Sequence, residues 1–321
     1  CCSPCPFLFL SRPVPLYTFY SQFFTVLPPL FPVFFNHTYL PHGKPGAIRA
    51  AGGHDPSRRH NKMKDAMRGC ILCYLLSILL RLALPDGYAY LYSTLPAVLA
   101  AVFIFCAARE RRGKEEARQA GNPRDIARLT ALAMPTALVL TVSLSMLTTL
   151  MFGEGGGSYD GSVFWLIIIH ALLPAVAEEI LFRLLPMSLF PGGHNLSLIL
   201  FSSLSFAVMH NDPRRIPHAF VAGIIFMTVD IAAHSAIPSF ILHLANNLLA
   251  VIMIKVGTGA EMYVLAVLVV LTLLTLPRLL HEEEILTLVR ESDSGWQLLR
   301  SPEMIIFCVS AIAVTIASLF I

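Results

Sequence analysis

Long apolar runs separated by short polar breaks dominate the chain from Met63 onward. A helix needs roughly 20 consecutive apolar residues to cross a bilayer, and several of these runs have about that length. We therefore predict an all-α, polytopic transmembrane helix bundle with about eight or nine spans. The expected spans cover residues 69–85, 88–108, 129–152, 162–190, 195–211, 216–233, 237–255, 262–280 and 303–321.

Composition indicates the same class of protein. Hydrophobic residues make up 56% of the chain and charged residues 13%, and the mean hydropathy is +0.69. A soluble domain carries about 25% charged residues. No water-soluble catalytic domain is therefore expected, and any chemistry must lie within the bundle. The net charge of +3 comes without a basic cluster interleaved with aromatic residues, so we expect the lipid bilayer as a partner and no nucleic acid.

The distribution of basic residues predicts an orientation. The loop 109–128 contains seven Lys and Arg residues, whereas the loop 153–161 contains none. Short cytoplasmic loops collect Lys and Arg, so the first loop is expected inside and the second outside. Two crossings precede the basic loop, which places Met63 in the cytoplasm as well. The HEEE stretch at 281–284 is expected to be a solvated turn.

Residues 1–62 differ from the rest of the chain. They are rich in Pro and Phe and contain no methionine, and no acidic residue precedes Asp55. Proline interrupts helices, so this segment cannot form one regular span. Our interpretation is that the natural start is Met63 and that residues 1–62 are a non-native or disordered extension.

Two adjacent acids and an arginine interrupt the apolar run at 162–190. Charges at membrane depth cost about 2.5–3.5 kcal/mol each or more, and they are usually functional. Glu179 and Arg183 are four positions apart and share a helix face, so an ion pair is expected. Glu178 points elsewhere on an α-helix, and a carboxylate without a partner is suited to act as a general base. The alternative is an ion-pair cluster that only fastens helices.

Two further polar pairs lie on later apolar segments. Phe206 and His210 are four positions apart, as are His243 and Asn247, whereas Asn246 points away. Each pair alone is compatible with ordinary hydrogen bonding between helices. Together with the acids, however, they offer a base, two imidazoles and an amide. This set can activate water and stabilise an oxyanion, so it indicates a hydrolase.

The order of these motifs resembles the CPBP family of intramembrane proteases, which includes the type II CAAX prenyl endopeptidases and the bacterial bacteriocin-immunity or "Abi" proteins. The matching motifs are E-E-x-x-x-R at 178–183, F-x-x-x-H at 206–210 and H-x-x-x-N at 243–247. The resemblance covers roughly residues 165–255. Leu184 stands where the family often has Gly, and the sequence at 233–235 is Ala-His-Ser where the family often has Thr-Gly-Ser.

This resemblance implies a membrane-embedded endopeptidase that acts on a peptide or membrane-protein substrate, in a bacterial cell membrane. Glu178 with His210 would activate a water molecule, and His243 with Asn247 would stabilise the oxyanion. Glu179 and Arg183 would form a structural ion pair. No cofactor is expected to be required. The alternative is zinc held by Glu178, His210 and His243, because two His and one Glu can ligate zinc.

The resemblance also suggests a division of the chain. The extension 1–62 would be followed by N-terminal transmembrane helices with the basic loop (63–160), a catalytic core (161–256) and C-terminal transmembrane helices (257–321). Two other functions stay open. One is a proton-coupled transporter that uses Glu178, Asp230 and the histidines, although no internal repeat of spans is visible. The other is a catalytically silent immunity or scaffold protein. The oligomeric state is not indicated by the sequence.

Overall fold

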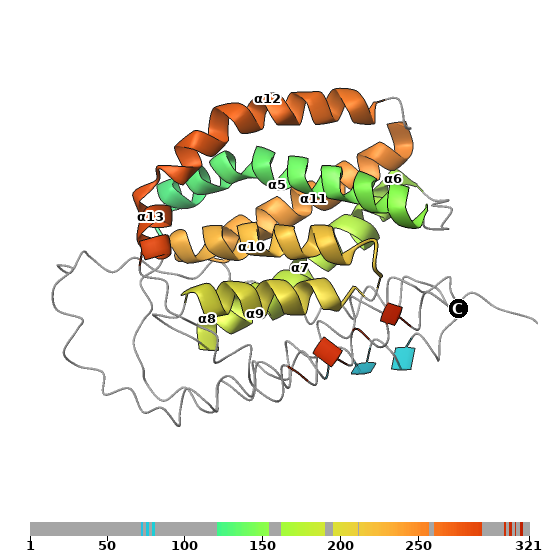
Figure 1. The fold of residues 1–321 in the computed structure, drawn as a ribbon, viewed down its shortest axis with the longest axis horizontal. Coiled ribbons are helices and arrows are strands. Elements are labelled where there is room, and N and C mark those ends of the chain that lie inside the picture. Colours follow the sequence, from blue (N-terminus) through green and yellow to red (C-terminus); the bar gives the residue numbers. More distant parts are fainter. Residues whose placement is uncertain are drawn as a thin grey trace, which may run out of the picture. The chain divides into compact units, whose positions relative to one another are not determined.

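The computed structural model describes residues 121–153, 162–189, 195–210, 212–256 and 260–290, with isolated positions in 72–80 and 305–316. The continuous stretches all belong to the compact unit His42–Ile321. Every regular element within these stretches is a helix, which confirms the all-α class for this part of the chain (Figure 1). The predicted extension 1–62 and the predicted spans 69–85, 88–108 and 303–321 lie outside the continuously described residues.

Helix α5, Pro123–Phe152, begins earlier than the apolar run alone predicted. The Asn122 side chain accepts a hydrogen bond from the backbone N–H of Arg124, and Pro123 occupies the first turn. An N-cap side chain and an early proline are typical helix-start signals, and here they extend the helix into the polar loop. The helix ends at Gly153, whose φ of 78° is readily adopted only by glycine.

The predicted span 162–190 is a succession of helical segments of two kinds. It comprises α6 (Val163–Leu166), the π-helical segment η3 (Ile167–Leu172), α7 (Leu173–Glu179), the π-helical segment η4 (Ile180–Leu184) and α8 (Leu185–Leu189). Pro174 lacks an N–H donor and would crowd the preceding turn of a regular α-helix, and the wider π-helical turns lie directly before it. π-Helical turns are frequently found at functional sites.

Four more helices follow the predicted spans closely. They are α9 (Asn195–Val208), α10 (Ile216–Ala232), α11 (Ile237–Val256) and α12 (Glu261–Leu280). Four helical stretches in the described part are long and apolar enough to cross a membrane: Pro123–Phe152, Val163–Met187, Ile237–Val256 and Glu261–Leu280. With 14 and 17 residues, α9 and α10 are only about 21 Å and 26 Å long. They are shorter than the roughly 30 Å hydrocarbon core, so the predicted total of eight or nine spans is not confirmed.

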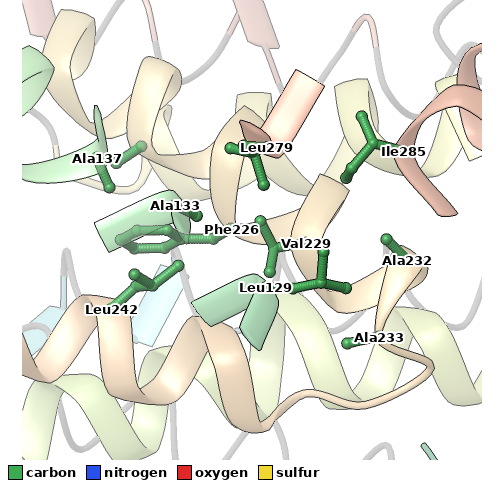
Figure 2. Packing of buried hydrophobic residues seen from close by; sticks show 11 residues of the cluster. Leu129, Ala133, Ala137, Phe226, Val229, Ala232, Ala233, Leu242, Leu279 and Ile285 are labelled. Carbon is green, nitrogen blue, oxygen red and sulfur yellow. The ribbon is translucent and has the colours of Figure 1, made fainter. Parts of the chain in front are cut away.

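A core of apolar side chains joins α5, α10 and α11 (Figure 2). Leu129 from α5, Phe226 from α10 and Leu242 from α11 are almost completely buried in it. Helix α10 also packs closely on α9, and the two run side by side in Figure 1. A Cβ atom at Gly223 would lie 2.8 Å from the Cα of Ser203, so only glycine permits this approach. Small residues at helix contacts are typical of membrane bundles.

The HEEE stretch is not the simple solvated turn that the sequence suggested. Its last two residues begin α13, Glu283–Arg290, which packs against α10. Arg128 of α5 forms ion pairs with Glu282 and Glu284, each with a 2.8 Å N–O distance. The glutamates therefore tie the end of α12 and the start of α13 to the beginning of α5.

Candidate active site

Two acids at the end of α7 begin the site. The Glu179 side chain is completely buried, and that of Glu178 is 12% exposed. Helix α7 lies between the two π-helical segments, and the chain leaves regular α-helical geometry immediately after these acids. The α-helical periodicity used to separate the two side chains therefore does not hold across 180–184.

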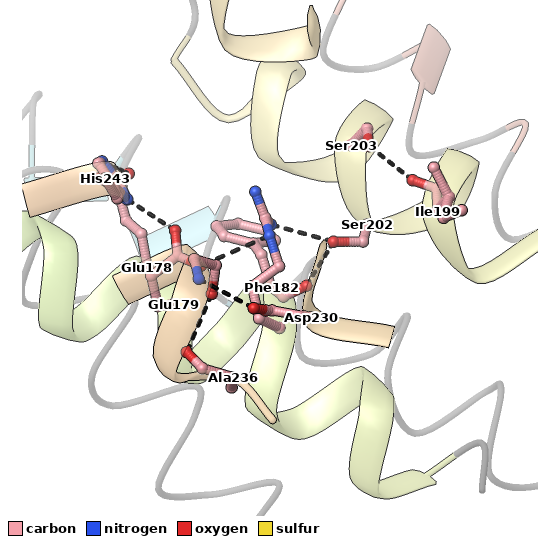
Figure 3. A network of polar contacts seen from close by, with 11 residues as sticks. Glu178, Glu179, Phe182, Ile199, Ser202, Ser203, Asp230, Ala236 and His243 are labelled. Carbon is pink, nitrogen blue, oxygen red and sulfur yellow. Dashed lines mark hydrogen bonds and ion pairs between the residues drawn. The ribbon is translucent and has the colours of Figure 1, made fainter. Parts of the chain in front are cut away.

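His243 of α11 lies between the two carboxylates (Figure 3). Its Nδ1 atom is 2.7 Å from Oε1 of Glu179, and its Nε2 atom is 3.8 Å from Oε2 of Glu178. The Glu179 contact is a hydrogen bond that fixes the orientation of the ring. Both acids thus approach the same imidazole from opposite nitrogens. Glu178 makes no ion pair with Arg183 among the described residues, but its spacing did not reveal the approach to His243.

Arg183 lies buried beside Glu179. Its Nε is 3.4 Å from Oε2 of Glu179, and its Nη1 donates a hydrogen bond of 3.0 Å to the Ser202 hydroxyl of α9. The guanidinium also lies 4.8 Å from the centre of the Phe206 ring and 5.8 Å from that of Phe226. A buried cation needs such partners, and aromatic faces attract it as well. Arg183 therefore joins the helices that carry the acids, Ser202 and Phe226.

Phe206 lies between the two histidines. Its ring centre is 5.1 Å from that of His210 and 5.4 Å from that of His243, and both pairs are edge-to-face. Nδ1 of His210 is 2.9 Å from the backbone carbonyl of Phe206, to which it can only donate. In neutral His210 the other nitrogen, Nε2, is then the proton acceptor.

The two asparagines of α11 have different surroundings. Asn246 accepts a hydrogen bond of 2.7 Å from the Thr141 hydroxyl of α5, so it faces that helix. Asn247 follows His243 by one helical turn and is half-buried. Within the described residues, its amide makes no hydrogen bond to the acids or histidines. The structure thus brings together Glu178, Glu179, Arg183 and the two histidines, and it leaves Asn247 at the edge of this group.

Some polar contacts of the site were not foreseen. Ser202 links Arg183 to the backbone carbonyl of Phe182, and it is completely buried. Asp230 of α10, also completely buried, accepts a hydrogen bond from the backbone N–H of Ser239. The sequence placed Asp230 in an apolar helix, which is itself a signal, but it could not reveal a partner on the next helix.

The connection between α9 and α10 carries a further carboxylate, outside the spanning segments. Asp212 binds the Arg214 side chain through both oxygens, at 2.9 Å and 3.0 Å, and Arg215 at 3.7 Å. Burial would raise the pKa of Asp212, but the hydrogen bonds from Arg214 and the two positive charges hold this pKa below its ordinary value.

The zinc alternative requires three ligands close together, Glu178, His210 and His243. The described part of the chain contains no group of three or more His, Cys, Asp or Glu side chains placed to hold a metal ion. Glu178 and His243 are neighbours. Nδ1 of His243 is bound to Glu179 and Nδ1 of His210 to a carbonyl, so Nε2 is the remaining nitrogen of each ring. The reaction proposed below uses no metal in any step.

Comparisons with known proteins agree with the motifs. No curated protein and no solved structure matches the chain. A family model described as "Type II CAAX prenyl endopeptidase Rce1-like" matches residues 160–249, which include all of the residues assembled above. This match confirms the resemblance to the CPBP proteases and, with the four long apolar helices, supports an integral membrane protein. Residues 160–249 are therefore similar to the type II CAAX prenyl endopeptidase Rce1-like family.

Proposed function

We propose that the chain is an endopeptidase that cleaves a peptide or membrane-protein substrate inside the membrane, with Glu178, His210, His243 and Asn247 as catalytic residues. The observation that carries this proposal is the buried imidazole of His243 between two adjacent carboxylates. A purely structural ion pair would need only Glu179 and Arg183. Glu178, the additional carboxylate at 3.8 Å from Nε2 of His243, is not needed for that ion pair and is suited to act as a general base.

Water activation falls to Glu178 and His210. Glu178 is the acid that is not fully buried and makes no ion pair with Arg183 in the described structure. It can take a proton from a water molecule as the water attacks the scissile carbonyl carbon. Nε2 of neutral His210, which is the accepting nitrogen, orients the same water. The proton then passes to the leaving amine as the carbon–nitrogen bond breaks.

Oxyanion stabilisation falls to His243 and Asn247. In its positively charged form, His243 donates from Nδ1 to Glu179 and from Nε2 to the developing oxyanion. The Asn247 amide, one turn along the same face of α11, supplies a second N–H donor. Donors fixed in advance at the position where charge develops commonly provide the largest part of catalysis.

Glu179 has a supporting part in this scheme. It binds Nδ1 of His243 and neutralises Arg183, so one carboxylate serves both the imidazole and the buried cation. A histidine whose one nitrogen is held by a carboxylate presents its other nitrogen in a fixed direction. Under this proposal, Glu179 therefore orients His243 in addition to forming the structural ion pair with Arg183.

The deciding experiment compares released peptides. Cells that produce the intact chain and cells that produce Glu178→Ala at equal levels are analysed by quantitative peptide mass spectrometry. Purified protein in phosphatidylcholine vesicles is then given one peptide with a C-terminal CAAX sequence, in prenylated and unprenylated forms. We expect peptides that depend on Glu178, and the vesicle assay reports whether prenylation is required. Identical peptides from both cell lines would contradict the proposal and favour a silent immunity or scaffold protein.

A further inference from the structure

Asp230 holds the beginning of the helix that carries His243. Its Oδ1 atom accepts a hydrogen bond of 2.9 Å from the backbone N–H of Ser239, in the first turn of α11. The first N–H groups of a helix have no partner within the helix, and an anion there is stabilising. In most helices a residue of the same segment supplies this partner. Here the side chain comes from α10, the preceding helix (Figure 3).

The short connection between the two helices is tied to the same residue. The backbone carbonyl of Asp230 accepts a hydrogen bond of 3.0 Å from the N–H of Ser235. The Ser235 hydroxyl in turn accepts one of 3.2 Å from the N–H of Ile237, the first residue of α11. Asp230 thus contacts both the connection and the first turn, which fixes where α11 starts and how it is rotated.

The first turn of α11, which Asp230 fixes, directly precedes the turn that carries His243. Ser239 and His243 are four positions apart on α11, so they share one face of the helix. A shift or rotation of the first turn would therefore move the His243 ring relative to both carboxylates of α7. The 2.7 Å contact with Glu179 and the 3.8 Å approach to Glu178 both depend on this position.

The second carboxylate oxygen of Asp230 indicates that this residue does more than fill space in the core. Oδ2 is buried and has no hydrogen-bond partner within the described residues. A buried polar atom without a partner is costly, so an apolar side chain would fill this position at lower cost. Unlike an apolar residue, however, the carboxylate accepts the hydrogen bond from the backbone N–H of Ser239.

We propose that Asp230 is a positioning residue that fixes the start of α11 through Ser239 and so places His243 between Glu178 and Glu179. This inference rests on the proposed endopeptidase function. It assigns to Asp230 an effect on the chemical step, because small displacements of a catalytic group lower the rate strongly. Substrate binding should be affected much less, because Asp230 itself is completely buried.

The test uses the full-length chain in vesicles and two measurements on each variant. Asp230→Ala removes the acceptor, Asp230→Leu removes it while keeping a side chain branched at Cγ, and Asp230→Asn retains an oxygen that can accept from Ser239. We expect kcat to fall by roughly 10- to 100-fold in the Ala and Leu variants, with KM within about threefold, and to recover largely in the Asn variant. Hydrogen exchange of the α11 peptide around 237–243 should accelerate in the first two variants only.

Asn122→Ala is the matched control. It also removes a side-chain acceptor from a helix N-terminus, but its hydrogen bond is made to Arg124 of α5 and not to α11. It should leave kcat and the exchange of α11 unchanged. An Asn variant as defective as the Ala variant, or unchanged exchange of α11 in the Ala and Leu variants, would overturn the proposal. If the wild-type chain cleaves nothing, the endopeptidase function fails by itself, whereas the exchange measurement still reports whether Asp230 holds α11.

Discussion

At the scale of single residues, the two neighbouring glutamates have different partners. Glu179 contacts both Arg183 and His243 and is completely sealed, whereas Glu178 approaches His243 alone and is slightly exposed. Sequence spacing correctly suggested that Glu179 and Arg183 lie together. It could not show that Glu179 also binds His243, because that contact joins residues 64 positions apart.

The two glutamates should therefore respond differently to the same substitution. Glu178→Gln should reduce cleavage by roughly 10²-fold or more, because the amide cannot accept the proton, with thermal stability near normal. Glu179→Gln should lower the folded yield, because breaking a buried ion pair costs about 3–5 kcal/mol. Peptide cleavage and thermal unfolding of the purified variants measure both effects. Full activity of Glu178→Gln would show that another group is the base.

The adjacent asparagines allow a second comparison. Asn247→Ala should lower kcat by roughly 10²–10³-fold with little change in KM, because its amide donates only to charge that develops in the transition state. Asn246→Ala removes the hydrogen bond with Thr141 and should cost about 0.5–1.5 kcal/mol of stability instead. Steady-state kinetics and thermal unfolding separate the two. Equal losses of kcat would mean that the face of α11 has been misassigned.

A further prediction at the residue scale concerns the requirement for a metal ion. Without a metal-dependent step, exhaustive chelation should leave most of the activity, and purified active protein should hold far less than one zinc ion per chain. Elemental analysis beside the cleavage assay measures this. Zinc present in stoichiometric amount, and lost together with activity, would make Glu178, His210 and His243 its ligands after a rearrangement of the site.

At the scale of elements, apolar runs predicted helix positions well. The run 262–280 corresponds to α12 at Glu261–Leu280, and the run 237–255 to α11 at Ile237–Val256. Such runs are informative because a helix in lipid must satisfy its own backbone and present an apolar surface. The π-helical segments and the α13 helix were missed. Neither changes the apolar pattern much, since both depend on local hydrogen bonding and on packing.

The connection between α10 and α11 contains a strained residue that can be tested. His234 has a φ of 52°, in the left-handed region that glycine adopts freely. His234→Gly should raise stability by about 0.5–1 kcal/mol, because the left-handed conformation costs other residues about 1–2 kcal/mol. Thermal unfolding in detergent measures the gain.

Ala233→Gly provides the control for this substitution. Ala233 has a φ of −81°, which alanine adopts without strain, so glycine there should lower stability by about 0.5–1 kcal/mol. Opposite shifts of the two variants would attribute the effect to backbone strain. A loss of stability in both would show that the interactions of the His234 side chain outweigh the strain.

At the scale of the molecule, charged residues outside the apolar helices contribute to stability in a way that depends on pH. Asp212 is the clearest example among the described residues, because two arginines hold its pKa below the ordinary value. A carboxyl group with a lowered pKa in the folded state stabilises that state while it is ionised. The contribution is present above the pKa of the unfolded chain and is lost as pH falls through the folded-state pKa.

This sign predicts the behaviour of Asp212→Asn. The variant should unfold at a lower temperature than the wild type at neutral pH, and the difference should shrink as the pH falls below the ordinary range for Asp. Thermal unfolding between neutral and acidic pH measures the difference. A gap that widens toward acidic pH would show that the ionised carboxylate does not stabilise the folded state.

The two π-helical segments around α7 make this part of the chain sensitive to its length. Each π turn accommodates more residues than an α turn, so the count of residues, as well as their identity, decides which way Glu178 and Glu179 face. Removing one residue from Ile167–Leu172 would rotate both acids away from His243 by about 100°, the angle between neighbouring α-helical positions. Related sequences should therefore vary freely in the apolar side chains of this segment while keeping its number of residues constant.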